Sequence, residues 1–177
     1  EGPRQPSMSK PREDDVLEGM WVAPFVMAPI NTKNVHRSNM LMGHPYGEEF
    51  MYSEMMVTGP GEKGQAIAEK LAATGGGLTG ENTPKPGEGP SREERETGFY
   101  EVLFVGKTAA GETIQATVKG DKDPGYGSTS KMIAESALCL VKDRTDTPGG
   151  LWTTAPALGA PLIDRLTAKA GLSFEAA

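Results

Sequence analysis

The sequence predicts an α+β fold, with a small mixed, antiparallel-rich sheet and helices packed on it. Two observations support this prediction. Residues 99–107 and 113–119 alternate between apolar and other side chains on either side of a short turn, which is typical of a β-hairpin. Residues 61–74 and 155–170 place apolar side chains at helical spacing, and a glycine follows each segment, as is common where amphipathic helices end.

The N-terminal part reads as a polar arm followed by short elements. Residues 1–20 carry three prolines and many charges, so we expect an extended arm. Residues 21–30 are apolar but contain two prolines, which favours buried extended chain over regular helix or central strand. A helix should then run to about Met42, with Asn31 or Thr32 as its N-cap.

Two further segments lie between this helix and the hairpin. Residues 50–57 alternate in the way that a strand does. Residues 75–97 hold almost no core-forming side chains, which indicates a flexible excursion. We expect residues 21–177, including this excursion, to form a single domain after the arm.

A glycine-rich loop, residues 121–130, should lead into a helix that ends near residue 143. Ser128, Thr129 or Ser130 can cap this helix. Its expected core face consists of four apolar side chains at helical spacing, Ile133, Ala137, Leu140 and Val141.

Composition and charge narrow the possible functions. The chain has 23 Gly, 14 Pro and 37% hydrophobic residues, which indicates much loop and a modest core. The formal net charge of −6, with both signs mixed along the chain, argues against a nucleic-acid partner. No apolar run approaches the ~20 residues of a membrane helix. The single cysteine, Cys139, fits a reducing compartment, so we expect a cytoplasmic protein.

The most informative segment is KGDKDPGYGSTSK, residues 119–131. It joins a strand to a helix through two glycines, and three hydroxyl side chains lie where the helix begins. Free backbone N–H groups and the positive end of a helix dipole favour an anion at such a junction, and Lys119, Lys122 and Lys131 would add charge. The simpler alternative is a tight turn in which Ser128 or Thr129 only caps the helix.

Other candidate sites are weaker. Asn31, Arg37 and Asn39 could line a polar pocket, although such residues more often cap helices. The two histidines, His36 and His44, have no partner at metal-ligand spacing, so we expect no metal site. A methionine cluster could bind an acyl chain, but core packing or a subunit interface is the commoner explanation; its members are Met40, Met42, Met51, Met55 and Met56.

The three glycines at residues 75–77 end a helix rather than open one, so they cannot cradle a pyrophosphate. We therefore expect this chain alone to bind no dinucleotide. The chain also begins at Glu1 without a methionine, so we expect a fragment or a processed product of a longer protein.

Four segments together resemble one family: WVAPFVMAPINTKNVHRSNML, YGEEFMYSEMM, KGDKDPGYGSTSKMIAESALCL and GGLWTTAPALGAPLIDRL. In this order they resemble the later part of the saccharopine-dehydrogenase-like oxidoreductases, which include the trans-acting enoyl reductases. The resemblance covers most of residues 20–174 and weakens across residues 75–97. Its most specific element is DPGYGST, residues 123–129.

The resemblance implies an oxidoreductase whose NAD(P) is held by an N-terminal Rossmann domain that this chain lacks. It implies that residues 21–177 form the second domain, which binds a small-molecule or acyl substrate and forms a homodimer. By itself the chain would be inactive. The alternative is a non-catalytic binding or structural module that keeps the fold without the chemistry.

Under this resemblance, Tyr126 could donate a proton or orient the substrate, and Lys131 could hold an anionic group. Gly125 and Gly127 would lie against the cofactor. The candidate substrate-binding residues are Asn31, Arg37, Asn39, Asp123, Ser128 and Thr129.

Overall fold

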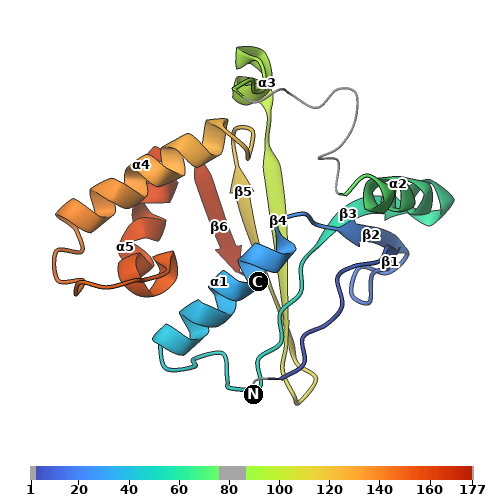
Figure 1. Ribbon diagram of the computed structural model, residues 1–177, viewed down its shortest axis with the longest axis horizontal. Helices are drawn as coiled ribbons and strands as arrows, with labels where there is room; N and C mark the ends of the chain where they lie inside the picture. The colour runs from blue at the N-terminus through green and yellow to red at the C-terminus, as the bar shows by residue number, and fades with distance from the viewer. Residues whose placement is uncertain (1–2, 76–86, 177) are drawn as a thin grey trace. The chain divides into compact units, whose positions relative to one another are not determined.

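The computed structural model describes residues 3–75 and 87–176. The chain divides into two compact units, Glu1–Thr83 and Pro84–Ala177, which we call the N-terminal unit and the C-terminal unit. Each unit contains a three-stranded antiparallel sheet and its own helices (Figure 1). The α+β prediction is therefore confirmed, although the strands form two small sheets rather than one. Within the described ranges, no helix is long and apolar enough to cross a membrane.

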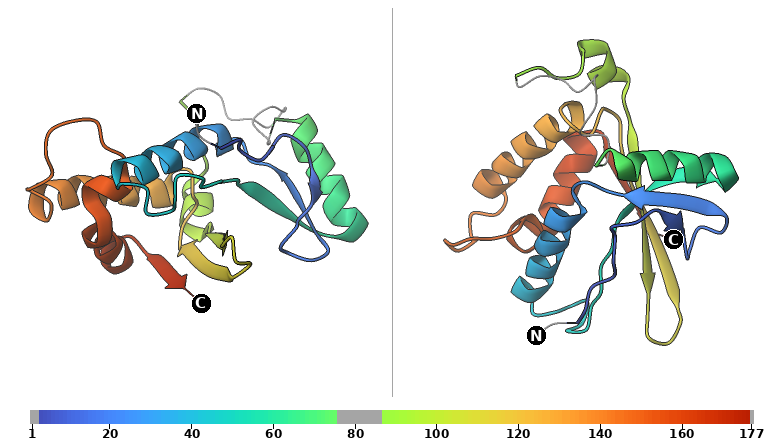
Figure 2. Two further views of the ribbon diagram at one scale, coloured as in Figure 1. Left: turned by 90° about the horizontal axis from the view of Figure 1, so that it is seen from below. Right: turned by 45° about the vertical axis from the view of Figure 1, so that its right-hand side comes forward.

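The N-terminal unit is built on the sheet β1-β2-β3. Its elements are β1 (Arg12–Glu13), β2 (Met20–Pro24), α1 (Ala28–Leu41), β3 (Met55–Pro60) and α2 (Gly61–Ala73). Both strand pairs are antiparallel. Helix α2 lies against β2 and β3, as both views in Figure 2 show.

Helix α1 begins earlier than the sequence predicts. Its N-cap is Met27, which makes no side-chain capping bond, so the prediction that Asn31 or Thr32 caps the helix is wrong. Pro29 lies in the first turn, where its missing N–H group costs no intrahelical hydrogen bond. The sequence predicted extended chain over all of residues 21–30. In the structure the strand β2 ends at Pro24, and α1 begins at Ala28.

Strand β3 begins later than expected, and only its first residues overlap with the predicted strand at 50–57. The N-terminal arm explains the difference. The backbone N–H of Tyr52 donates to the side chain of Gln5 at 2.9 Å, and that of Glu54 donates to the sulfur of Met8 at 3.1 Å. Side chains of the arm therefore take the place of a neighbouring strand before Met55.

Helix α2 confirms the predicted amphipathic helix, but its most closely packed side is formed by small residues. Gly64 and Ala68 are buried, whereas Ile67 is exposed. A Cβ atom on Gly64 would overlap the carbonyl group of Gly59, so only glycine allows the helix to approach β3 this closely. The hydroxyl of Thr58 donates to the Gly64 carbonyl at 2.9 Å and strengthens the same contact.

The C-terminal unit is built on the sheet β4-β5-β6. Its elements are α3 (Arg92–Thr97), β4 (Tyr100–Lys107), β5 (Thr113–Gly120), α4 (Gly127–Lys142), α5 (Thr154–Lys169) and β6 (Leu172–Ala176). Strands β4 and β5 confirm the predicted hairpin, and β6 adds an unpredicted antiparallel strand to β5. Helix α3 forms inside the segment for which the sequence predicted no element; residues 76–86 of that segment lie outside the described residues.

Helices α4 and α5 pack side by side in both views of Figure 2. The core of this unit joins α5, the end of β5, the start of β6 and one side of α4; its buried members are Cys139, Ala157, Leu158, Leu162, Leu166, Ala170 and Leu172. The predicted core face of α4 is wrong. Ile133 and Val141 are 69% and 71% exposed, because the helix turns Ser128, Met132 and Cys139 inward instead.

Candidate functional site

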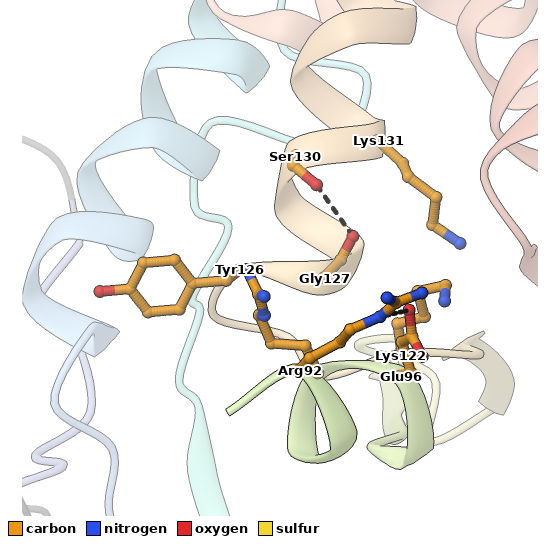
Figure 3. A pocket seen from close by; sticks show the side chains of 8 residues that line it. Arg92, Glu96, Lys122, Tyr126, Gly127, Ser130 and Lys131 are labelled. Atoms are coloured by element: carbon orange, nitrogen blue, oxygen red, sulfur yellow. Dashed lines mark hydrogen bonds and ion pairs between the residues drawn. The ribbon is translucent and has the colours of Figure 1, made fainter. Parts of the chain in front are cut away.

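A pocket of about 390 Å³ lies between α3 and the start of α4 in the C-terminal unit (Figure 3). The side chains around it are unusually basic for a chain of net charge −6. Its charged and hydroxyl-bearing lining residues are Arg92, Arg95, Glu96, Lys122, Tyr126, Ser130 and Lys131.

Two glycines hold the walls of this pocket together. A Cβ atom on Gly127 would lie 2.7 Å from the carbonyl oxygen of Arg95, and one on Gly98 would lie 2.8 Å from the Cβ of Asp123. The backbone N–H of Asp123 also donates to the Arg95 carbonyl at 3.3 Å. The end of α3 and the loop before α4 therefore approach at a distance that larger residues would prevent.

Helix α3 is stabilised locally by a capping box. The N–H of Glu94 donates to the Ser91 hydroxyl at 3.2 Å, and the N–H of Ser91 donates to the Glu94 carboxylate at 2.8 Å. This arrangement presents Arg92 and Arg95, one turn apart, to the pocket. Sequence reasoning missed both arginines, although the Ser-x-x-Glu pattern at residues 91–94 was a visible signal for a helix start.

Asp123 organises the loop at the start of α4. Its carboxylate accepts hydrogen bonds from the backbone N–H groups of Gly125, Tyr126 and Gly127, at 3.0, 3.0 and 2.5 Å. Burial opposes ionisation, but these bonds and the nearby Arg95 together lower the pKa of Asp123. The helix begins at Gly127, with Tyr126 at its N-cap and no side-chain capping bond, so the prediction that Ser128, Thr129 or Ser130 caps it is wrong.

The same bonds determine what the glycine-rich loop can offer a ligand. The N–H groups of Gly125 and Gly127, expected to face a cofactor, already donate to Asp123. A Gly-x-Gly-x-x-Gly turn, residues 59–64, does join β3 to α2, but β3 pairs antiparallel with β2, unlike the parallel strands of a dinucleotide-binding βαβ unit. A ligand bound at the loop before α4 would have to be recognised by side chains.

The hydroxyls of this loop are engaged in packing. Ser128 is completely buried, and its hydroxyl is 2.9 Å from that of Tyr100 on β4. The Thr129 hydroxyl donates to the Pro124 carbonyl at 2.5 Å, and that of Ser130 donates to the Gly127 carbonyl at 3.1 Å. Ser128 and Thr129 thus position the start of α4.

Tyr126 and Lys131, the proposed catalytic pair, are not brought together. Figure 3 shows the Tyr126 ring directed away from the amine of Lys131. The ring lies against Gly89, whose added Cβ would be 3.3 Å from it, and Tyr126 is 54% exposed. The Lys131 amine donates to the Asp121 carboxylate at 2.6 Å. Both residues line the pocket, at different positions on its wall.

The other predicted site residues belong to the N-terminal unit. Asn39 is buried, and its amide group bonds to the backbone of Tyr46 and Gly47, which is a structural role. Arg37 is exposed on α1.

Asn31 belongs to a polar cluster that the sequence did not indicate. Its side chain donates to one oxygen of Glu54 at 2.7 Å, and the Tyr52 hydroxyl donates to the other at 2.6 Å. Burial, the hydrogen bond to Glu54 and the charge of Glu54 all raise the pKa of Tyr52. One turn apart on α1, Thr32 and His36 each bury a polar atom for which the described residues supply no hydrogen-bond partner.

The remaining candidate residues do not come together in one site. Met40, Met42 and Met51 are exposed, while Met55 and Met56 are partly buried in β3, so these methionines line no common core. Burial raises the pKa of the Cys139 thiol. In the ranges 3–75 and 87–176, no three His, Cys, Asp or Glu side chains are grouped as metal ligands would be.

Sequence comparison identifies relatives over almost the whole chain. The chain is 36% identical, over 194 aligned positions, to a Mycobacterium tuberculosis (strain H37Rv) protein provisionally named a trans-acting enoyl reductase; the match covers 98% of this chain and 45% of that protein. A trans-acting enoyl reductase of Mycobacterium ulcerans is 37% identical over 182 positions, which cover 92% of this chain and 43% of the relative. One from Mycobacterium bovis (strain BCG) is 36% identical over 167 positions, covering 85% and 40%.

The chain thus spans less than half the length of these curated relatives. It is related in sequence to proteins named as enoyl reductases. No family profile matches the chain, and no solved structure matches it.

Proposed function

We propose that this chain is the substrate-binding and dimerisation part of an NAD(P)-dependent enoyl reductase of the saccharopine-dehydrogenase-like type. The observation that carries the proposal is the similarity to proteins named trans-acting enoyl reductase, which extends over 98% of the chain. The cofactor would be held by a part of such a protein that this chain does not span.

The pocket between α3 and α4 supports a substrate-side role. It offers ammonium and guanidinium groups from Lys122, Lys131 and Arg95, and a phenol from Tyr126. The Tyr126 hydroxyl makes no hydrogen bond within the described ranges, so it is available to a substrate oxygen. Reduction of an enoyl group delivers a hydride to one carbon and a proton to the other, and donors near the conjugated carbonyl oxygen stabilise the charge that develops there.

An uncovered apolar face supports the dimerisation part of the proposal. Alternate residues of a strand share a face, so Val102 and Phe104 lie on the same side of β4 as Tyr100, which contacts α4. Their cross-strand partners continue this face to Phe174 on β6 and to Ile114 on β5. Val102, Phe104, Ile114 and Phe174 are each between 36% and 59% exposed, which suits an interface with a second copy.

Direct binding tests the substrate-side assignment. The chain is titrated calorimetrically with an enoyl thioester of pantetheine, which carries no phosphate, and separately with NADH. We expect saturable binding of the thioester and no binding of NADH at micromolar concentration. Absence of thioester binding, or one-to-one micromolar binding of NADH, would contradict the proposal.

A further inference from the structure

We propose that the pocket between α3 and α4 binds a phosphoryl group. Four cationic side chains, those of Arg92, Arg95, Lys122 and Lys131, line it together with one carboxylate, that of Glu96. Two more carboxylates, of Asp121 and Asp123, lie beside the lining. The lining residues and these two neighbours together carry four positive and three negative charges, while Glu93 and Glu94 of α3 lie outside the lining.

Two of the four cations are free to contact a ligand. Arg92 pairs with Glu96 at 2.9 Å, and Lys131 pairs with Asp121 at 2.6 Å. Lys122 forms no ion pair within the described ranges. The charge of Arg95 lowers the pKa of Asp123 without a hydrogen bond between the two side chains. The Asp123 carboxylate already accepts hydrogen bonds from three backbone N–H groups. Lys122 and Arg95 therefore supply the charge that would hold an anion.

The pocket is open to solvent, and the backbone on both of its sides is held in place. Its walls are fixed by the close approaches of Gly127 to Arg95 and of Gly98 to Asp123. Arg95 comes from α3, while Lys122 comes from the loop before α4. The backbone at both residues is thereby fixed, so both side chains reach the same pocket.

The chemistry of the donors favours a phosphoryl oxygen. A guanidinium group offers a planar pair of donors that suits phosphate, and an ammonium group adds a point charge. The backbone amides that cradle pyrophosphate in dinucleotide sites are engaged by Asp123 here. The volume, about 390 Å³, falls within the range of small-molecule sites, so the phosphoryl group would belong to a larger ligand.

This inference deepens the proposed function, on which it rests. Apart from the pyrophosphate that NADH and NADPH share, the phosphoryl group has two chemical sources in an NAD(P)-dependent enoyl reductase: the 2′-phosphate of NADPH and the phosphate of the phosphopantetheine arm that carries acyl thioesters. Binding is measured without turnover and without an acyl group. The proposed function is tested with a thioester that carries no phosphate, so the two proposals can fail independently of each other.

The test is calorimetric titration of the whole chain with inorganic phosphate, followed by two ligand pairs that differ by one phosphate: NADPH with NADH, and 4′-phosphopantetheine with pantetheine. We expect a dissociation constant for phosphate of about 1 mM, and about tenfold weaker binding in the double variant Arg95→Gln, Lys122→Gln. The matched control, Lys107→Gln with Lys142→Gln, removes two charges outside the pocket and should bind as the original chain does.

A larger affinity for NADPH than for NADH assigns the phosphoryl group to the cofactor, and a larger affinity for 4′-phosphopantetheine than for pantetheine assigns it to the acyl-carrying arm. Either result supports the inference. No saturable phosphate binding, equal affinities within both pairs, or equal weakening in the control would overturn it. Since the charge of Arg95 also acts on Asp123, which holds the loop, the single variant Lys122→Gln is titrated too and its melting temperature is measured.

Discussion

The carboxylate of Asp123 accepts a 2.5 Å hydrogen bond from the backbone N–H of Gly127, the first residue of α4. This bond satisfies a donor at the start of the helix that would otherwise lack an intrahelical partner. The same N–H group would be a natural contact for a bound anion. A side chain of the protein therefore occupies the position that the sequence assigned to a ligand.

Asp123→Ala should lower the free energy of unfolding by about 1 kcal/mol, a usual cost of losing a side-chain hydrogen bond. The pKa of Asp123 is lowered in the folded chain, so its contribution is present above the unfolded pKa of about 3.9 and is lost as the pH falls through the folded pKa. Denaturant unfolding between pH 7 and pH 2 measures both effects. A variant with the same acid sensitivity as the original chain would contradict this account of Asp123.

Tyr100 and Ser128 should be energetically coupled. Their hydroxyls are 2.9 Å apart, and Ser128 is completely buried, so removing either one leaves the other unsatisfied. Tyr100→Phe and Ser128→Ala should each cost about 1–3 kcal/mol, and the double variant should cost less than the sum. A double-mutant cycle measured by urea unfolding tests this. Strict additivity would mean that the hydrogen bond contributes nothing.

Local sequence patterns predicted elements better than they predicted packing. The hairpin and α2 were visible because their periodicity and turns are local. The core face of α4 was not, because Ile133 and Val141 are as apolar as buried residues, and only the tertiary structure shows that Ser128 and Met132 face inward instead. In the N-terminal unit, contacts of the distant Gln5 and Met8 decide where β3 begins.

The candidate site was predicted in part. The loop at residues 121–130 and Lys131 do line a pocket, but the opposite wall comes from α3, in a segment whose composition suggested no structure. Arg92 and Arg95 carry no sign of function in the sequence, because their role depends on the approach of Gly127. The roles of Tyr126 and Lys131 as a catalytic pair remain a prediction.

Gly64→Ala should destabilise the packing of α2 on β3. The added Cβ would overlap the Gly59 carbonyl, a backbone group that cannot rotate away. We expect a loss of about 1–3 kcal/mol in the free energy of unfolding, as is usual for overpacking. Gly149→Ala is the control, because a Cβ there meets no atom within 4 Å. Equal stability of the two variants would show that the close approach is not needed.

Phe104→Glu should abolish self-association without unfolding the chain. Phe104 is 43% exposed on the face proposed for the dimer, so a charge there costs little in the monomer but much in an apolar interface. Leu103→Glu is the matched control on the opposite face of β4, with a similar exposure of 38%. Sedimentation at micromolar concentration reports the result. A chain that is always monomeric, or one disrupted equally by both changes, would contradict the proposed surface.

The central claim is that this chain supplies the substrate side of an enoyl reductase, and turnover tests it most directly. The chain is joined to the part of the Mycobacterium ulcerans relative that it does not span, and oxidation of NADPH is followed with an enoyl thioester. We predict substrate-dependent oxidation of NADPH that falls at least about tenfold in Tyr126→Phe, or about 1.4 kcal/mol of transition-state stabilisation, while the melting temperature is unchanged. A folded hybrid that oxidises no NADPH in the presence of the thioester would contradict the claim.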